Sequence, residues 1–386
     1  MNNMNAKKRE TNLELLRILA MLMVISLHYL GKGNALVEIG DLYVSSPHIV
    51  NKMLAWTLEV LSYGAVNIYM MISGYFLINS TAKMEKPFKI VVQVFFYSAG
   101  IFLIFYCLNQ LPGYAFETYY KGIFFTPIAS AHYWFASSYV FFYLLAPFAA
   151  LGMRKLNEVQ HRGLMIIMLL LFSSLWKIIL PQSAPIDDKG YGLMWFLTLF
   201  VVAAYIRRFV PVKKKKRFLY LGIYFLASLF TLGSFFIVNM IYHATGRFEV
   251  FIQVLLEYNS PTIVVASVCL FLFFRTITIP DGFLAKAILF VSPLTFGIYL
   301  IHEHFLLRDF WQTFWKVEDY LAKPYFILHF IGVVLAVFSI CGFIEWVRKT
   351  LFDLFFRSVV GKWLLGLLGK LDVIFPKKDE DFSVAE

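Results

Sequence analysis

The chain has 386 residues, of which 60% are hydrophobic and 15% are charged, and its mean hydropathy is +0.70. Soluble domains are nearer half apolar and about a quarter charged, so this chain cannot cover itself with polar surface and we expect a bilayer to be its solvent. The net charge of +11 then indicates basic loops beside a membrane, and we expect no nucleic-acid partner.

Ten apolar segments are long enough, or nearly so, to span a membrane, for which about 20 residues are needed. They lie near residues 13–31, 56–78, 88–108, 133–152, 163–180, 191–206, 217–241, 262–279, 284–305 and 325–347. We therefore predict an all-α integral membrane protein of about ten transmembrane helices, with one membrane domain over residues 13–349.

The two ends of the chain differ from this domain. Residues 1–12 are predicted to be a cytoplasmic segment. In residues 350–375 charged side chains recur through an apolar stretch, "LFDLFFRSVVGKWLLGLLGKLDVIF", which is typical of an amphipathic helix lying on the membrane surface. The charged tail, 376–386, is predicted to be disordered.

The basic residues favour one orientation of the spans. If the N-terminus is cytoplasmic, every segment on that side holds at least two Lys or Arg residues, including the run Lys213–Lys216. Cytoplasmic loops of membrane proteins carry such an excess of positive charge. We therefore predict that both termini are cytoplasmic, and the composition fits the plasma membrane of a bacterium.

The first span, "NLELLRILAMLMVISLHYL", carries three ionisable residues. His28 lies eleven residues after Arg17, which is about 16 Å along a helix and close to three turns, so both side chains share one face. Glu14 stands three residues before Arg17 and can pair with it. Ionisable groups at such depths usually face a protein interior or a cavity.

Polar residues of other spans fall at the same two depths. The outer level holds Glu59, His132, Trp134, Trp195, His302, Glu303 and His304. The inner level holds Arg17, Ser73, Gly74, Lys83 and Lys86. Histidines and carboxylates suit general acid–base chemistry, and the basic inner level suits phosphates. A ligand with phosphates at one end and a reactive group about 15–20 Å away would bridge the two levels, and an acyl-coenzyme A has that shape.

Together these residues resemble the acyltransferase-3 family of integral membrane acyltransferases. Arg17 and His28 resemble the motif of its first helix, with Glu14 at an often acidic position. "MMISGYFL", "HYWF", "MWFLTLFVVAAY" and "FGIYLIHEH" resemble its later motifs in the family's order. The resemblance covers residues 12–347.

The resemblance implies transfer of an acyl group, usually acetyl from acetyl-CoA, to a hydroxyl of a glycan or lipid-linked saccharide at the cell surface. It also implies that Arg17 and His28 are essential. Two departures from many members are expected: Lys83 and Lys86 stand where paired arginines are common, and we expect no extracytoplasmic hydrolase-like domain.

The catalytic residues expected from this reading are His28, Glu59, His302 and Glu303. His28 is the general base for the acceptor hydroxyl, because the unperturbed pKa of histidine lies near neutrality. Glu59 or Glu303 would orient it, and His302 would line the site. A covalent acyl-histidine stays open as an alternative, as does a succinyl in place of an acetyl group.

Binding residues are expected at both levels. Those for the acyl-CoA are Arg17, Ser73, Lys83 and Lys86, and those for the acceptor are His132, Trp134 and Trp195. Membrane lipid is a further partner, and the sequence leaves a homo-oligomer open. We expect no metal, because the 3 cysteines, Cys107, Cys269 and Cys341, lie in apolar segments without the spacing of a metal site.

Simpler interpretations stand beside these. Arg17 can be a snorkelling arginine that sets topology, Trp134 part of an aromatic belt, and Ser73 part of a close helix approach. Span-end residues are expected to snorkel, namely Lys177, Arg275, His329 and Glu345.

Two other function classes remain open. The chain can be an exporter of a glycan intermediate, although no internal repeat typical of transporters is visible. It can also be a membrane sensor or scaffold, which would not need Arg17 and His28 on one helix face. Binding or hydrolysis of acetyl-CoA distinguishes the enzyme from both.

Overall fold

The computed structural model describes residues 9–32, 36, 49–111, 133–176 and 189–376. The regular structure of these residues is helical throughout, as expected where a bilayer leaves backbone groups no water to bond. Within this part of the chain, seven helical stretches are long and apolar enough to cross a membrane. The protein is therefore a multi-pass, all-helical membrane protein.

The seven stretches coincide with seven of the ten predicted spans. They are Thr11–Gly31, Ile49–Leu77, Glu85–Cys107, Trp134–Lys155, Lys214–Thr245, Phe283–His302 and Phe326–Arg357. The other three predicted spans overlap shorter apolar helices, α8 (Glu158–Phe172), α10 (Leu193–Phe209) and α13 (Pro261–Arg275). The total of ten and the cytoplasmic termini stay predictions.

The chain forms two compact units. Unit 1 consists of Met1–Tyr69, Pro211–Tyr299 and Val317–Gly342, and unit 2 of Met70–Val210, Leu300–Lys316 and Phe343–Glu386. Three helices run from one unit into the other: α4 (Ala65–Leu77), α15 (Thr295–His302) and α18 (Phe326–Arg357). Each of the other helices lies wholly within one of the two units.

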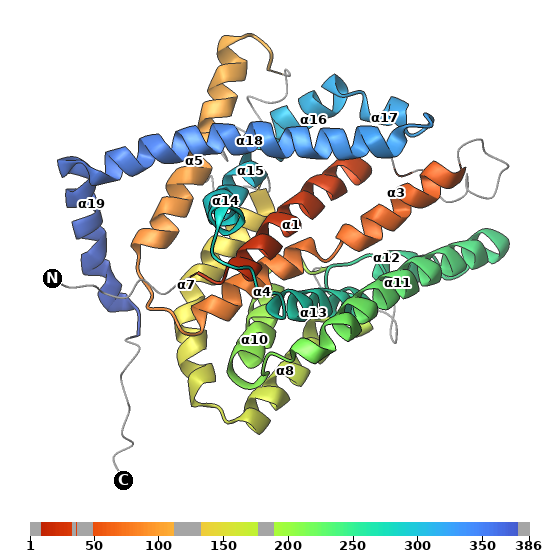
Figure 1. Cartoon of the computed structure of the whole chain (residues 1–386), viewed down its shortest axis with the longest axis horizontal. Coiled ribbons are helices and arrows are strands. Elements are labelled where there is room, and N and C mark those ends of the chain that lie inside the picture. The colour runs from red at the N-terminus through yellow and green to blue at the C-terminus, as the bar shows by residue number, and fades with distance from the viewer. Residues whose placement is uncertain (1–8, 33–35, 37–48, 112–132, 177–188, 377–386) are drawn as a thin grey trace. The chain divides into compact units, whose positions relative to one another are not determined.

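In unit 1, α1 (Thr11–Leu27) is the central helix. It packs against α3 (Ile49–Ser62), α13 and α14 (Phe283–Val291), and the long α11 (Arg217–Thr245) lies along α13 (Figure 1). The unit also contains α12 (Glu249–Val254), the 3-10 turn η4 (Ser292–Leu294) and α17 (Val317–Tyr320). Because α1 has neighbours on several sides, even its charged residue Glu14 is buried.

Small and polar residues allow the helices of unit 1 to approach closely. A Cβ atom at Gly64 would come within 2.7 Å of Ser267 Oγ on α13. One turn later, Asn67 Nδ2 donates to the Tyr258 carbonyl oxygen at 2.8 Å. Small residues at a helix interface and hydrogen bonds across it are how membrane helices associate.

Unit 2 is built on α5 (Glu85–Cys107), α7 (Trp134–Lys155), α8 and α10, with α10 packed on both α7 and α8. Gly74 of α4 lies directly against α10, since a Cβ there would stand 3.1 Å from the Cα of Phe200. This is the close helix approach that was one of the two interpretations of the Ser73–Gly74 pair.

Arg208 closes the C-terminal end of α7. Its guanidinium donates to the carbonyl oxygens of Met153, Arg154 and Leu156, at the helix end where carbonyl groups lack the amide four residues later. It also donates from Nη1 to Nδ1 of the buried His161 at 3.1 Å, while His161 Nε2 donates to the Val201 carbonyl oxygen at 3.1 Å. Both ring nitrogens of this histidine are therefore used in joining α8 to α10.

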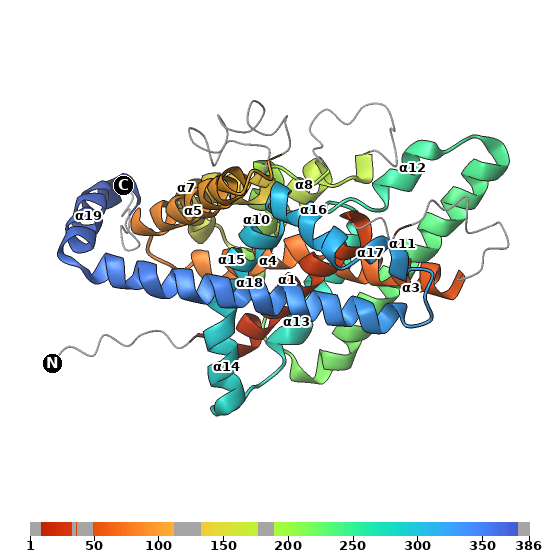
Figure 2. The same cartoon turned by 90° about the horizontal axis from the view of Figure 1, so that it is seen from above.

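The chain turns sharply after α18. Ser358 caps the next helix, α19 (Val359–Lys370), by accepting from the Gly361 amide at 3.2 Å, and a Cβ at Gly361 would overlap the Phe355 carbonyl oxygen. The corner thus requires a glycine. Figures 1 and 2 both show α19 leaving α18 at this corner.

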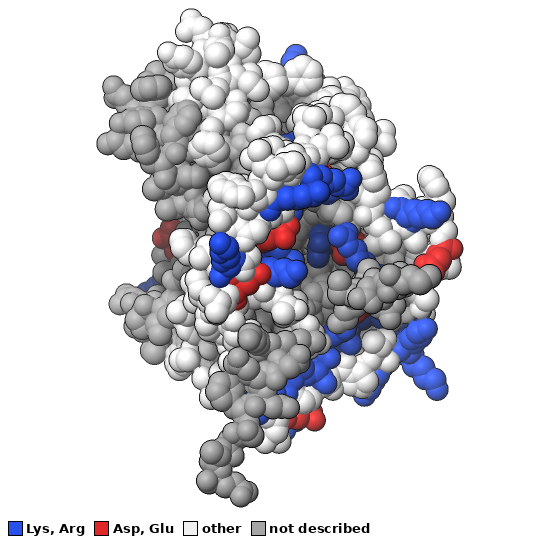
Figure 3. Space-filling view, turned by 90° about the vertical axis from the view of Figure 1, so that its left-hand side faces the viewer, with Lys and Arg blue, Asp and Glu red and all other residues white. Residues whose placement is uncertain are grey.

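The segment after the corner is held against α5. In the 3-10 turn η5 (Leu371–Ile374), Asp372 Oδ1 accepts from the Met84 amide at 2.7 Å, at the start of α5. Val359 and Trp363 of α19 are exposed apolar residues, while Lys362 and Lys370 are exposed and basic. This composition of α19 suits the headgroup region of an anionic membrane. Figure 3 shows one face of the molecule, on which lysine and arginine side chains are exposed beside a few acidic ones.

Candidate active site

The N-terminal end of α1 carries an ion pair. Arg17 Nη1 lies 3.4 Å from Glu14 Oε2, with the side chains 26% and 6% exposed respectively. The pairing of residues three apart on a helix is the one expected from the sequence. Since a guanidinium has five N–H donors, the single contact with Glu14 leaves Arg17 able to bind an anion as well.

The C-terminal end of α1 changes its geometry at His28. The α-helix stops at Leu27, and His28 begins a five-residue π-helix, η1 (His28–Lys32). Because the α-helix is unbroken from Arg17 to Leu27, the rise between Arg17 and His28 remains about 16 Å. Single π-helical turns occur frequently at functional sites, and the half-buried His28 stands at the first position of this one.

Glu59 of α3 is a buried carboxyl group beside this turn. It is 7% exposed, and its Oε2 has no hydrogen-bond partner among the described residues. A Cβ atom at Gly31 would lie 3.7 Å from Glu59 Oε1, so the carboxyl group faces the backbone of η1. A buried carboxyl oxygen without a partner is costly, and such groups within membrane helices mark functional sites.

The other predicted catalytic residues lie in unit 2, at the end of α15 and just before α16 (Phe305–Phe314). His302 is buried, and its carbonyl oxygen accepts from Trp311 Nε1 at 3.1 Å. Glu303 Oε1 lies 3.2 Å from Arg308 Nη1, so its charge is already compensated.

His304 has a structural role at this point. Its Nδ1 accepts from the Leu306 amide at 3.3 Å, which caps α16, and its Nε2 lies 3.4 Å from the Ser98 carbonyl oxygen. Both ring nitrogens face backbone groups, as expected of a buried histidine that fixes a helix start.

The predicted acceptor residues also belong to unit 2. Trp134 begins α7, and its ring centroid lies 4.4 Å from that of Tyr191. Trp195 is among the largest fully buried side chains, at the start of α10, so it is part of the packed interior. His132 lies outside the described residues.

The predicted binding residues of the inner level other than Arg17 lie at two places in unit 2. Ser73 Oγ lies 3.3 Å from Tyr139 Oη on α7. Lys83 and Lys86 are exposed at the start of α5, next to the Met84 amide that bonds Asp372. The two lysines are therefore presented at a helix start that the C-terminal segment holds in place.

Two buried charges were expected only to snorkel. Arg275 is buried at the end of α13, where the adjacent Phe274 carbonyl oxygen accepts from Asn12 Nδ2 of α1 at 2.9 Å. Since this contact brings the end of α13 to the start of α1, Arg275 lies at the same end of unit 1 as Arg17. The position of Arg275 along its span could not predict this location, because the contact joins Phe274 of α13 to Asn12, which is 262 residues away in the chain.

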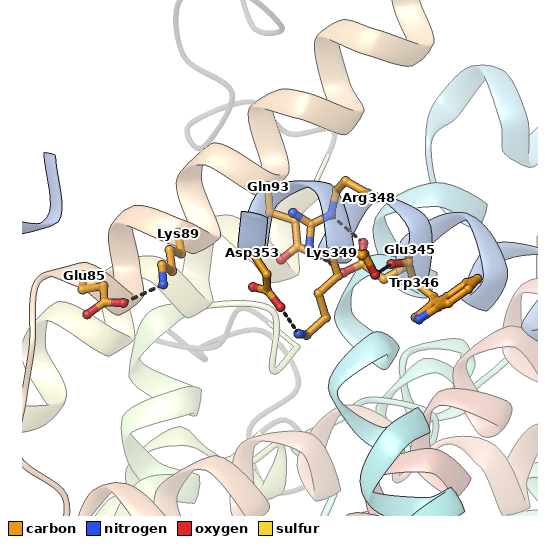
Figure 4. Close-up of polar contacts among 9 residues, drawn as sticks. Glu85, Lys89, Gln93, Glu345, Trp346, Arg348, Lys349 and Asp353 are labelled. Carbon is orange, nitrogen blue, oxygen red and sulfur yellow. Dashed lines mark hydrogen bonds and ion pairs between the residues drawn. The ribbon is translucent and has the colours of Figure 1, made fainter. Parts of the chain in front are cut away.

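The other is Glu345 of α18 in unit 2, which is 1% exposed. It accepts from Tyr97 Oη at 2.7 Å, from Gln93 Nε2 at 3.2 Å and from Arg348 Nη2 at 2.6 Å (Figure 4). Every partner lies on α5 or on α18 itself, so the network joins these two helices.

Unit 1 thus brings together Glu14, Arg17 and Arg275 at one end of α1, and Glu59 with the turn of His28 at the other. A family profile described as an acyltransferase domain matches residues 10–346. The chain belongs to the acyltransferase-3 family. This membership supports a membrane acyltransferase activity for the chain. No curated protein and no solved structure matched the chain with significance.

Proposed function

We propose that this acyltransferase-3 protein takes an acetyl group from cytoplasmic acetyl-CoA and transfers it to a hydroxyl of an extracytoplasmic or lipid-linked glycan. The observation that carries the proposal is the arrangement on α1. A cation lies at the inner end, and a histidine on a π-helical turn lies about 16 Å further out. That separation suits a donor with phosphates at one end and a thioester at the other.

At the inner end, Arg17 binds the phosphates of coenzyme A, and Arg275 supplies a second positive charge at the same end of unit 1. Arginine suits this task because its planar group can make two parallel hydrogen bonds to a phosphate. The exposed Lys83 and Lys86 raise the local concentration of the anionic donor.

At the outer end, His28 acts as the general base. Its neutral imidazole removes the proton of the acceptor hydroxyl as that oxygen forms a bond to the thioester carbonyl carbon. The carbon–sulfur bond then breaks, the imidazolium returns the proton to the sulfur, and coenzyme A leaves as its thiol. The products are an acetyl ester of the glycan and free coenzyme A.

Glu59 is the carboxyl group that supports His28. It faces the η1 turn and has an oxygen without a hydrogen-bond partner among the described residues, whereas Glu303 is already paired with Arg308. An ionised carboxylate beside a catalytic histidine fixes the orientation of the ring and stabilises the imidazolium. This difference in pairing favours Glu59 over Glu303 for that role.

The test is turnover of radiolabelled acetyl-CoA by the purified protein in lipid nanodiscs, followed by thiol release and by label transferred to a saccharide mixture. The wild type is expected to release coenzyme A, and His28→Ala to lower the rate by about 10²- to 10⁴-fold, the usual contribution of a general base. His243→Ala, an exposed histidine of α11, is the matched control and should keep the wild-type rate.

Two outcomes would contradict the proposal. Wild-type turnover by His28→Ala would remove the proposed base. No thiol release by the well-folded wild type with any acyl-CoA would favour the exporter instead, because an exporter has no need to cleave a thioester.

A further inference from the structure

Tyr29, the residue after His28 on the η1 turn, is fully buried at 0% exposure. Its ring centroid lies 5.1 Å from that of Phe330 and 6.4 Å from that of Phe326, both on α18. Its hydroxyl lies 2.7 Å from Nδ1 of His329, also on α18. A residue of the π-helical turn is therefore bonded to a helix some 300 positions later in the chain.

His329 is itself held in place. Its ring is stacked on that of Tyr320, with centroids 3.5 Å apart and an interplanar angle of 9°. The segment after Tyr320 is tied to α3, because Asn51 Nδ2 donates to the carbonyl oxygens of Leu321 and Lys323 at 2.9 and 2.8 Å. All these residues belong to unit 1, and α3 is the helix that carries Glu59.

The η1 turn needs a stabilising contact of this kind. A π-helix is uncommon and lasts a single turn or so, since its hydrogen bonds are less favourable than those of an α-helix. Buried polar side-chain atoms usually have a hydrogen-bond partner, and the partner of the Tyr29 hydroxyl is His329, so the position of His329 favours one position of Tyr29. With neutral His329, Tyr29 donates its proton to Nδ1, and the ring proton lies on Nε2.

We propose that Tyr29 and His329 form a positioning pair for His28, which fixes the η1 turn and thereby the direction in which the His28 side chain points. The inference rests on the proposed function, because it assigns the pair to the base of that reaction. His28 and Tyr29 are consecutive residues of one five-residue turn, so a shift at Tyr29 moves the backbone that bears the imidazole. Neither Tyr29 nor His329 touches the reacting atoms.

A residue that positions the catalytic base should affect kcat, whereas a residue that only packs in the interior should not. Tyr29→Phe retains the ring contacts with Phe326 and Phe330 and removes only the hydroxyl. We expect kcat to fall about 10-fold, the scale of effect of a misaligned reacting group, while KM for acetyl-CoA changes less than about twofold. His329→Phe should give the same loss, and the double variant should be no slower than either single one, because both remove one interaction.

Rescue and control variants complete the design. His329→Asn should recover most of the rate, since its Oδ1 stands near the place of the ring Nδ1 and accepts the same proton. Tyr97→Phe is the matched control, because it also removes a buried hydroxyl bonded at 2.7 Å, here to Glu345 in unit 2. Its kcat is expected to stay within about twofold of the wild type, as for a residue outside the site.

A second readout does not depend on turnover. The rate at which diethyl pyrocarbonate modifies His28, followed by mass spectrometry, should change at least about threefold in Tyr29→Phe, since the exposure of the ring follows the turn, and should not change in Tyr97→Phe. An unchanged modification rate together with an unchanged kcat in Tyr29→Phe would overturn the proposal, as would an equal effect of Tyr97→Phe. If the wild type showed no acyl transfer, the proposed function would fall, and the modification rate alone would still decide whether the pair positions His28.

Discussion

Two glutamates buried in the membrane helices have opposite surroundings. Glu345 in unit 2 is 1% exposed and accepts hydrogen bonds from Tyr97, Gln93 and Arg348. Glu59 in unit 1 is 7% exposed, and its Oε2 has no partner among the described residues. The hydrogen-bonded carboxylate of Glu345 joins two helices, whereas a buried carboxyl oxygen without a partner is costly, and this cost is the reason for placing Glu59 in the proposed site.

The comparison extends to the histidines. His161 uses both ring nitrogens in joining α8 to α10, and His304 uses both at the start of α16. His28 stands half-buried where the regular helix ends and a π-helical turn begins. Residue type is the same on both sides of the comparison, so the surroundings of each side chain distinguish those that join helices from those proposed to take part in the chemistry.

The largest effect is expected from Glu345→Ala. Breaking a buried pair leaves Arg348 uncompensated, which typically lowers the free energy of unfolding by about 3–5 kcal/mol. Thermal unfolding in nanodiscs should show a clear fall in Tm, while acetyl-CoA turnover per folded molecule stays near that of the wild type. An unchanged Tm would mean that the network in Figure 4 does not stabilise the fold.

Glu59→Gln should lower turnover without lowering Tm, which is the opposite of the result expected for Glu345→Ala. The substitution keeps the shape of the side chain, and the buried carboxyl group has an oxygen without a hydrogen-bond partner among the described residues, so Tm should be equal or higher. Turnover should fall about 100-fold, because the imidazolium of His28 loses its carboxylate. The interpretation of Glu59 would be wrong if this variant lost stability and kept its turnover.

Arg275→Gln is expected to have a smaller effect. Because Arg275 lies at the same end of unit 1 as Arg17, its loss should raise KM for acetyl-CoA roughly fivefold, with little change in kcat, as for a charge-assisted contact to a phosphate. Lys286→Gln on α14 is a control for net charge alone. If both variants raised KM for acetyl-CoA equally, Arg275 would make no specific contact with the donor.

The smallest effect concerns pH. Burial, with a contribution from the Arg208 guanidinium, lowers the pKa of His161 below its usual range. Below about pH 6.5 the unfolded chain binds a proton at this position that the folded chain does not, so stability is lost as the pH falls. Tm measured between pH 5 and 8 should therefore decline less toward low pH in His161→Phe than in the wild type, and parallel curves would contradict this assignment.

The sequence predicted the helical fold from its apolar segments, the pairing of Glu14 with Arg17 from their spacing on one helix, and the family from motifs on several spans. From the sequence, Glu345, His329 and Arg275 were predicted only to snorkel. Hydropathy indicates how deep a residue lies along a span, but it does not identify the residues of other helices that contact it. Glu345 and Tyr97 are 248 residues apart in the chain. The π-helical turn at His28 could not be predicted either, since a turn of five residues does not alter the hydrophobic pattern of the span.

The most direct measurement is acetyl-CoA binding and turnover by His28→Ala beside Arg17→Gln. If the two ends of α1 serve the two ends of one donor, His28→Ala binds acetyl-CoA with the wild-type Kd and does not turn it over, while Arg17→Gln binds it at least about tenfold more weakly. Wild-type turnover by His28→Ala, or a wild-type Kd for Arg17→Gln, would contradict the account.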